Sequence, residues 1–441
     1  MGKYFGTDGF RGEAGVALTA EHAYKVGLIL GYVLGRGKGK CRAVIGKDTR
    51  LSSYMLEYSL AAGLTASGAD AYILHVTTTA SVSYITRCDG FDCGIMISAS
   101  HNKFTDNGIK LFNAQGEKME DKVIEVIERY LDDATALPLA SGVNIGRTVD
   151  YISGRNRYIG HLIALSTCSY KGLRIGLDAA NGSAFMVARS VFDALGAKTF
   201  LIGGSPNGRN INDGVGSTHI ERLAELVKSN SLDIGFAFDG DADRCICVDE
   251  RGEVLTGDEE LYVLANSLKS RGELAGNRVV CTVMSNGGLI KSLKSKGISC
   301  SVCNVGDKNV CDEMNVTGAV LGGERSGHIV FSKYETTGDG LVTAIMLMEA
   351  VVENKCKLSD LTKGYTSLPQ VLINVAVNDR QAAIKRVESI VEKVSGALGV
   401  RLLVRASGTE ELLIRIMAEG ESYENCVAAC GEIRSKLEAE G

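Results

Sequence analysis

The sequence contains no tryptophan and only three prolines among 441 residues, and it has no surplus of basic residues. The formal net charge is −5, so the chain offers no overall positive field for nucleic acid or an anionic membrane surface. No stretch reaches the roughly 20 apolar residues that cross a bilayer as a helix. We therefore expect a protein that binds neither nucleic acid nor membrane, and that holds any anionic ligand at a focused site.

The proportions of hydrophobic (45%) and charged (23%) residues predict a folded chain, whose length is typical of about two to four domains. Thirteen cysteines are scattered from Cys41 to Cys430, and the first residues, MGKYFGTDGF, do not resemble a secretion signal. We therefore expect free thiols and a cytoplasmic location. The cluster of Cys300, Cys303 and Cys311 has no second pair, so a zinc site is not favoured.

Three segments share one pattern: an apolar strand, a short turn, an amphipathic helix ending at a small residue and Gly, and a second apolar strand. The predicted helices cover residues 53–67, 184–195 and 289–296. Each copy is interpreted as a βαβ unit, with chance similarity among such common units as the alternative. The pattern predicts an α/β fold with three similar α/β sandwich domains that contain mixed sheets.

The C-terminal part has a different order of elements, β-α-β-β-α, which predicts a small α+β domain. A turn-rich segment, KGYTSLPQ, precedes it, and Pro369 in this segment blocks the continuation of a helix. The expected domains are residues 1–150, 151–253, 254–366 and 367–441.

An acidic motif, Asp239-Gly-Asp241-Ala-Asp243-Arg244, lies between two apolar strands. Three carboxylates in a tight turn repel one another unless a cation binds them, and hard oxygen ligands suit Mg²⁺. An EF-hand calcium loop is a weaker interpretation, because Glu250 falls at the twelfth position but Arg244 replaces the glycine required at the sixth. The alternative without a bound ion is a solvated acidic turn. The motif predicts a magnesium site.

A hydroxyl motif, Ser98-Ala-Ser100-His101-Asn102, follows the apolar strand CGIMI, and Lys110 comes shortly after it. A hydroxyl at a strand end beside His and Lys is placed for nucleophilic work or for accepting a phosphoryl group. Serine and histidine in turns are also common capping groups, so this segment alone leaves both interpretations open.

A phosphate-binding motif is indicated by Arg405-Ala-Ser407-Gly408-Thr409, with Arg415 on the returning strand. Hydroxyls, a flexible glycine and two guanidiniums are suited to bidentate phosphate binding. An ordinary hairpin with surface arginines is the alternative.

The last motif is Gly322-Gly-Glu324-Arg-Ser326-Gly-His328, whose polar side chains on a glycine-rich turn are suited to reading sugar hydroxyls. By itself it is equally consistent with a decorated turn. Together, the four motifs fall one in each expected domain, an arrangement that a cleft between domains would explain.

These motifs resemble the α-D-phosphohexomutase superfamily: YFGTDGFRG, SASHN with NGIK, DGDADR, GGERSGH followed by TTGDG, and RASGTE occur in order from Tyr4 to the C-terminal domain. The resemblance implies three α/β domains and a C-terminal α+β domain around a central cleft. The segment 210–219, with the YFGTDG and GGExSGH forms, favours the members that act on glucosamine phosphates over phosphomannomutases and phosphoglucomutases.

The resemblance also implies a role for each matched residue. Ser100 would carry the phosphate and contribute an oxygen to the Mg²⁺ site formed by Asp239, Asp241 and Asp243. The remaining implied residues are Arg11 and Arg244 near the phosphoserine, His101, Lys110 and His328 for catalysis, Glu324 and Ser326 for the sugar, and Arg405, Ser407, Gly408, Thr409 and Arg415 for the substrate phosphate. The chain departs from the family pattern at Lys103 and Glu411, where proline is usual.

The implied reaction is an isomerisation of glucosamine 6-phosphate and glucosamine 1-phosphate through a phosphoserine and a sugar 1,6-bisphosphate, which also serves as activator. Such an enzyme feeds UDP-N-acetylglucosamine synthesis. Its partner is a small phosphosugar, and a homodimer is left open. The alternatives are a phosphomannomutase or phosphoglucomutase, a hydrolase that uses the same serine and metal, and a sensor without activity.

Overall fold

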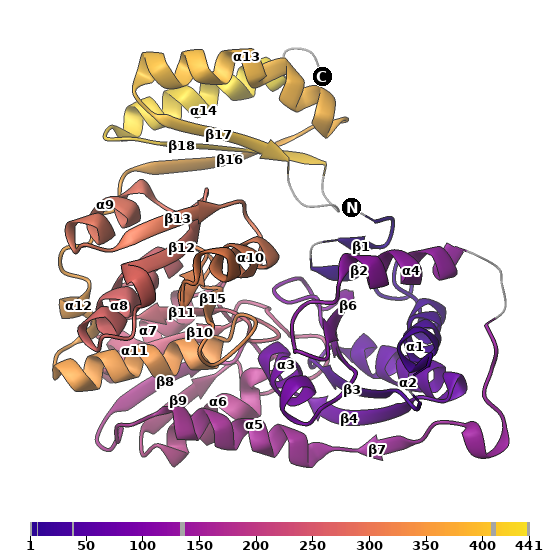
Figure 1. The fold of residues 1–441 in the computed structure, drawn as a ribbon. Coiled ribbons are helices and arrows are strands. Elements are labelled where there is room, and N and C mark those ends of the chain that lie inside the picture. The colour runs from indigo at the N-terminus through magenta and orange to yellow at the C-terminus, as the bar shows by residue number, and fades with distance from the viewer. Residues whose placement is uncertain (1, 7, 38, 133–136, 407–411, 439–441) are drawn as a thin grey trace. The chain divides into compact units, whose positions relative to one another are not determined.

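The computed structural model describes residues 2–6, 8–37, 39–132, 137–406 and 412–438, which form two compact units (Figure 1). The large unit comprises Met1–Met284 and Lys296–Lys363. The small unit comprises Ser285–Ser295 and Gly364–Gly441. The large unit contains three β-sheets, and the small unit contains one.

The first sheet has seven strands in the order β1-β2-β6-β5-β3-β4-β7 and mixes parallel with antiparallel pairs. Helices α1, α2 and α4 cover one face and α3 covers the other. Successive side chains of a strand such as β3 point to opposite faces, so the strand contributes apolar residues to both cores. The elements are β1 (Phe5–Gly6), β2 (Gly9–Glu13), α1 (Ala20–Gly35), β3 (Arg42–Lys47), α2 (Leu51–Ser67), β4 (Asp70–Val76), α3 (Thr79–Cys88), β5 (Cys93–Ile97), β6 (Asp106–Asn113), α4 (Asp121–Asp132), η1 (Gly142–Asn144) and β7 (Thr148–Asp150).

The second and third sheets each have four strands, in the orders β11-β10-β8-β9 and β13-β12-β14-β15. Helix α11 is apolar around its circumference, and its first three turns are buried within the large unit. The elements are α5 (Ile152–Leu165), β8 (Arg174–Asp178), α6 (Ala184–Ala194), β9 (Lys198–Ile202), α7 (Glu221–Asn230), β10 (Ile234–Phe238), β11 (Cys245–Val248), α8 (Gly257–Ser270), η2 (Ala275–Asn277), β12 (Arg278–Thr282), β13 (Ser299–Cys303), α10 (Asp307–Thr317), β14 (Leu321–Gly323), β15 (Ile329–Phe331), α11 (Gly340–Asn354) and α12 (Leu358–Leu361).

The small unit has an antiparallel sheet in the order β16-β18-β17, packed against two helices. The helix α13 begins where the Asp379 side chain accepts hydrogen bonds from the first turn, and it packs Val387 and Val394 into the core. The elements are α9 (Gly287–Ser295), β16 (Gln370–Ala376), α13 (Arg380–Leu398), β17 (Arg401–Ala406), β18 (Leu413–Glu419) and α14 (Tyr423–Glu438).

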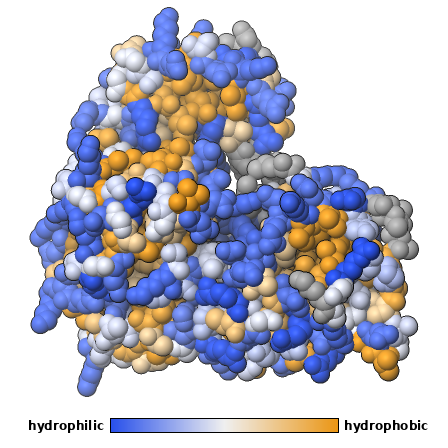
Figure 2. Space-filling view, viewed as in Figure 1, coloured by the Kyte–Doolittle hydropathy of each residue, from blue (hydrophilic) through white to orange (hydrophobic). Residues whose placement is uncertain are grey.

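The predicted fold class is confirmed. The three predicted βαβ units have the parallel strand pairs β3–β4, β8–β9 and β12–β13, and their helices begin and end within two residues of the expected bounds. The C-terminal order β-α-β-β-α is also as predicted. Among the described residues, no helix is long and apolar enough to cross a membrane. Figure 2 shows hydrophilic side chains over most of the face in view, with apolar side chains in separate patches.

Candidate active site

Two loops of the large unit meet at Ser100. The serine follows β5, is buried, and has a left-handed backbone with φ of 53°. The antiparallel strands β10 and β11 pair Phe238 with Cys245, so that the loop between them presents Asp239. The Ser100 hydroxyl donates a hydrogen bond to Asp239 Oδ2 at 2.5 Å. The nucleophile candidate is therefore held against the acidic motif.

The three aspartates of that motif form a compact, buried cluster. Their oxygen ligand atoms all lie within 4.8 Å of one another. Burial, followed by the charges of Asp243 and Asp241, raises the pKa of Asp239 well above its usual value. Asp241 Oδ1 and Asp243 Oδ1 are buried and accept no hydrogen bond within the part of the chain that the structure describes. Buried carboxylate oxygens that accept no hydrogen bond are suitable ligands for a hard divalent cation, so the cluster fits a metal ion.

Lys110 on β6 faces the same cluster. Its Nζ lies 2.6 Å from Asp241 Oδ2 and 3.0 Å from Asp243 Oδ2. Burial lowers the pKa of Lys110, but the two carboxylates outweigh burial and raise this pKa above its usual value. The lysine is therefore a cation that is already paired with two of the aspartates.

His101 and two arginines lie around Ser100. His101 Nδ1 is 3.3 Å from Ser100 Oγ. Burial, and then the positive charges of Arg244 and Arg11, lower the pKa of His101 to about 4, so the imidazole is neutral at pH 7. The Nε atoms of Arg11 and Arg244 are buried and donate no hydrogen bond to any described residue. These donors are available to an anion bound at Ser100.

His328 approaches the aspartates from the turn between β14 and β15. Its Nδ1 is 3.9 Å from Asp243 Oδ1. Burial lowers the pKa of His328, but the neighbouring Asp243 carboxylate raises it overall. Gly338, in the TTGDG motif, makes this position accessible, because a Cβ there would lie 2.4 Å from the imidazole Cε1. The glycine therefore gives the ring the space in which it lies.

Glu324 and Ser326 occupy the same turn as His328. Glu324 Oε1 accepts a hydrogen bond from the backbone N–H of Gly306 at 2.9 Å, which fixes the carboxylate from a second segment. Its Oε2 is 3.4 Å from the Ser326 hydroxyl. Both side chains are partly exposed, as contacts to a sugar require.

Arg405 and Arg415 lie in the small unit, on the neighbouring strands β17 and β18. They are register partners, so their side chains emerge opposite each other on the same face of the sheet. Like charges placed opposite each other favour binding of an anion between them. The predicted phosphate contacts Ser407, Gly408 and Thr409 lie outside the described residues, as does Glu411.

Thr79, at the start of α3, also contacts the aspartate cluster, and sequence reasoning missed it. Its hydroxyl donates to Asp241 Oδ2 at 2.5 Å, and its N–H donates to the Asp241 carbonyl at 3.0 Å. The only sequence signal is a run of three threonines before a helix, which is equally typical of an N-cap.

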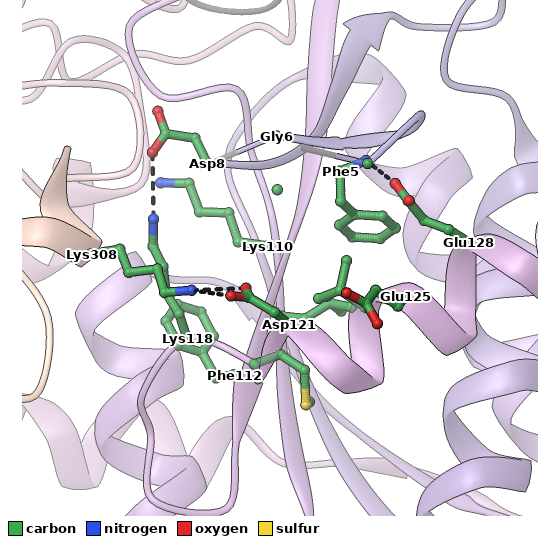
Figure 3. A pocket seen from close by; sticks show the side chains of 15 residues that line it. Phe5, Gly6, Asp8, Lys110, Phe112, Lys118, Asp121, Glu125, Glu128 and Lys308 are labelled. Carbon is green, nitrogen blue, oxygen red and sulfur yellow. Dashed lines mark hydrogen bonds and ion pairs between the residues drawn. The ribbon is translucent and has the colours of Figure 1, made fainter. Parts of the chain in front are cut away.

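A cavity of about 440 Å³ opens beside Lys110, between the β1–β2 hairpin, β6 and α4. Figure 3 shows Lys118 reaching toward Asp8, and Lys308 beside Asp121. Lys308 Nζ lies 2.7 Å from the Asp121 carboxylate. The apolar residues that line the cavity include Phe5, Phe112 and Met119. The volume is typical of small-molecule pockets.

The chain belongs to the phosphoglucomutase/phosphomannomutase family. Residues 2–137, 156–252 and 256–368 match the family's alpha/beta/alpha domains I, II and III, and residues 372–434 match its C-terminal domain. The resemblance inferred from the motifs is confirmed at this level.

Two proteins of similar sequence bear the name phosphoglucosamine mutase. The chain is 56% identical to a phosphoglucosamine mutase from Lachnospira eligens, covering 100% of this chain and 99% of the relative. It is also 56% identical to a phosphoglucosamine mutase from Lachnoclostridium phytofermentans, covering 97% and 96%.

Solved structures share the fold. A phosphoglucomutase/phosphomannomutase family protein from Burkholderia thailandensis superposes with a TM-score of 0.81 at 24% identity, covering 99% of this chain and 97% of that one. The N-acetylphosphoglucosamine mutase of Aspergillus fumigatus, in complex with GlcNAc-6P and magnesium, gives a TM-score of 0.68 at 17% identity, covering 100% and 96%.

Proposed function

We propose that the chain is a phosphoglucosamine mutase, which interconverts glucosamine 6-phosphate and glucosamine 1-phosphate and so feeds UDP-N-acetylglucosamine synthesis. Relatives that bear this name match the whole chain at 56% identity. The observation that carries the proposal is the Ser100 hydroxyl, buried and 2.5 Å from Asp239 beside two further aspartates. This arrangement suits a serine that receives and returns a phosphoryl group.

The residues of the large unit divide the work around Ser100. Asp239, Asp241 and Asp243, together with an oxygen of the phosphorylated serine, would hold Mg²⁺. When bound, the ion neutralises negative charge on the phosphoryl oxygens. Arg11 and Arg244 add hydrogen-bond donors for the same oxygens, which is consistent with their buried Nε atoms, since neither donates a hydrogen bond to a described residue.

The sugar hydroxyl that receives or releases the phosphoryl group needs a partner for its proton. We assign this duty to Lys110 and His328, which contact the aspartates beside Ser100, and to His101, whose Nδ1 lies 3.3 Å from the serine oxygen. Glu324 and Ser326 are proposed to bind the sugar hydroxyls from the turn that also carries His328.

The phosphate that the substrate already carries does not react while Ser100 transfers its own phosphoryl group to the free sugar hydroxyl. We assign this substrate phosphate to Arg405 and Arg415 with the predicted loop residues 407–409. The opposed arginines support this assignment. A sugar 1,6-bisphosphate is the proposed intermediate and activator, since each half-reaction exchanges one phosphoryl group with Ser100. A phosphate-binding site that accepts the phosphate at either end of the sugar allows this intermediate to reorient within the enzyme.

We also propose a cellular location and an oligomeric state for the protein. All thirteen cysteines are free thiols in the structure, which supports a cytoplasmic location. We also propose a homodimer, which sedimentation velocity tests against the mass of one chain, 46.8 kDa. The bounds 1–150, 151–253, 254–366 and 367–441 are kept as the proposed domains.

A ³¹P NMR time course tests the reaction. The purified protein, with Mg²⁺ and a trace of glucose 1,6-bisphosphate, receives glucosamine 6-phosphate, glucose 6-phosphate and mannose 6-phosphate in one tube. We expect glucosamine 1-phosphate to appear first, and a Ser100→Ala control to form none. Preference for glucose or mannose phosphate would instead identify a phosphoglucomutase or phosphomannomutase, and release of inorganic phosphate would identify a hydrolase.

A further inference from the structure

We propose that Arg50 and Asn212 are positioning residues, which clamp the backbone of residues 100–106, here called the Ser100 loop, and so aim the serine oxygen for phosphoryl transfer. The inference rests on the proposed phosphoserine role of Ser100. Neither residue touches the reacting atoms, and both act through backbone carbonyl groups.

The Ser100 loop needs external support. A left-handed backbone such as that of Ser100, with φ of 53°, is unfavourable for a residue with a side chain. The loop residues 100–106 include no proline, so no ring restricts the backbone there. The loop conformation must therefore be stabilised by contacts from outside.

Arg50 supplies the first half of this support. Its guanidinium is completely buried, and Nη2 donates to the carbonyls of Ser100 at 2.9 Å and of Asn102 at 3.0 Å. The other terminal nitrogen, Nη1, donates to the carbonyls of Lys103 and Asp106. One rigid, planar group thus fixes four carbonyls of the loop relative to one another.

The charge of Arg50 is balanced locally. Its Nε donates to Asp48 Oδ2 at 2.7 Å, and the same carboxylate oxygen accepts the Ser98 hydroxyl at 2.7 Å. The Ser98 hydroxyl in turn accepts the backbone N–H of Ser100 at 2.9 Å. The guanidinium is therefore held in place, and Ser100 is fixed at both its N–H and its carbonyl.

Asn212 supplies the second half, from the segment between β9 and α7. Its side-chain amide donates to the carbonyls of Ser100 at 2.9 Å and of Asn102 at 3.0 Å, the same two that Arg50 Nη2 contacts. Gly240 of the acidic motif packs on the Ser100 carbonyl as well, because a Cβ there would lie 2.5 Å from that oxygen. The Ser100 carbonyl is therefore held between Asn212 and the segment that carries Asp239.

The position of Ser100 Oγ depends on this clamp. If the carbonyl of Ser100 rotates, its side chain moves away from Asp239. A misplacement of about 1 Å at a reacting atom lowers the rate about 100-fold, whereas binding of the distant substrate phosphate is unaffected. Loss of the clamp is therefore expected to lower kcat and to leave KM nearly unchanged.

The test uses two variants of Asn212 in the full chain. Asn212→Gly removes the donor without strain, since the native backbone is left-handed with φ of 58°. Asn212→Asp replaces the donor with an acceptor that faces two carbonyl oxygens. We expect kcat to fall about 10-fold in the first and about 100-fold in the second, with KM within about twofold of the original protein.

The matched control is Asn266→Asp, which makes the same change at an amide that donates to the Tyr262 carbonyl at 2.7 Å within α8. We expect this control to keep its kcat. A kcat in both Asn212 variants within twofold of the control would overturn the proposal. So would a rise in KM that accounts for the whole loss of kcat/KM. Arg50→Lys keeps the positive charge but loses the planar guanidinium that contacts four carbonyls. This variant should lower kcat as the Asn212 variants do.

Hydrogen exchange of the backbone amides in the Ser100 loop separates this proposal from the proposed function. It is measured on the unphosphorylated protein and needs no turnover. Exchange about 10-fold faster in Asn212→Gly than in the original protein supports the clamp even if the sugar specificity is wrong. Unchanged exchange in the loop contradicts the clamp even if the mutase activity is as proposed.

Discussion

Two donors orient the Asp241 carboxylate of the proposed metal site. Thr79 and Lys110 both donate to Oδ2, so Oδ1 is left buried and without a partner among the described residues. Groups that orient a metal ligand in this way are worth about 10- to 100-fold in metal affinity. Thr79 begins α3, which packs on the first sheet, whereas Asp241 lies in the loop between β10 and β11 of the second sheet, so this contact links the two.

Thr79→Val removes the hydroxyl but keeps the shape of the side chain and the backbone hydrogen bond to Asp241. We predict that Mg²⁺ affinity, measured by titration calorimetry, falls about 10-fold. Thr86→Val is the control, because the Thr86 hydroxyl is also buried in α3 but donates only to Val82 of its own helix. Equal affinities in the two variants would show that Thr79 has no effect on the metal.

The sequence predicts Asp239 as a site residue but not Thr79, because only Asp239 belongs to a local pattern. Alternating aspartates between two apolar strands form a local pattern with one chemical explanation. The partner of Thr79 lies 162 residues away, and that of Asn212 lies 112 residues away. Threonine before a helix and asparagine in a loop have many common local roles, so their contacts emerge only when the chain is folded.

At the scale of the elements, the edge strand β11 contacts a buried carboxyl group of the helix α8. This strand is the edge of the second sheet and directly follows the acidic motif. The backbone N–H of Cys247, which no strand pairs, donates to Glu260 Oε1 of α8 at 2.8 Å. Glu260 is completely buried, and burial raises its pKa to about 8. The carboxyl group therefore closes a sheet edge that would otherwise leave a donor unsatisfied.

Glu260→Gln keeps an oxygen for the Cys247 N–H and removes the ionisable group. In the original protein, the pKa of Glu260 is higher in the folded state than its usual 4.5, so its contribution to stability is complete below pH 4.5 and is lost as the pH rises toward 8. We predict that the Tm of the variant relative to the original protein increases from pH 5 to pH 8. The limiting slope is about 1.4 kcal/mol per pH unit. A constant difference in Tm over this range would contradict the assigned shift.

Element boundaries could be predicted well where the apolar pattern was regular. The βαβ helices and the C-terminal strands each have a repeating apolar face, whose period is set by the geometry of the element alone. The place of His328 in the site could not be predicted in this way. It depends on Gly338, just before α11, which gives space to the imidazole through tertiary packing.

At the scale of the whole molecule, the two units contain different parts of the proposed machinery. The serine, the aspartates and the sugar contacts belong to the large unit, and the opposed arginines belong to the small unit. Storage of the phosphoryl group and capture of the substrate phosphate should therefore be separable by mutation.

Arg415→Ala removes one of the two opposed guanidiniums. We predict that KM for glucosamine 6-phosphate rises about 10-fold or more, as expected for a lost charged hydrogen bond. The fraction of purified protein that carries phosphate on Ser100, measured by intact-protein mass, should not change. Arg434→Ala, which removes an exposed arginine paired with Glu438 on α14, is the control. An unchanged KM in Arg415→Ala would exclude this residue from the phosphate site.

The contact of Thr79 and Asn212 with loops of another sheet has an evolutionary consequence. A gene recombination that joins residues 1–150 of one relative to residues 151–253 of another inherits half of each contact from each parent. The product is functional only if both parents carry compatible partners at these positions. The first two sheets should therefore be inherited as one block, whereas exchange of the C-terminal segment 367–441 leaves the contacts around Ser100 intact.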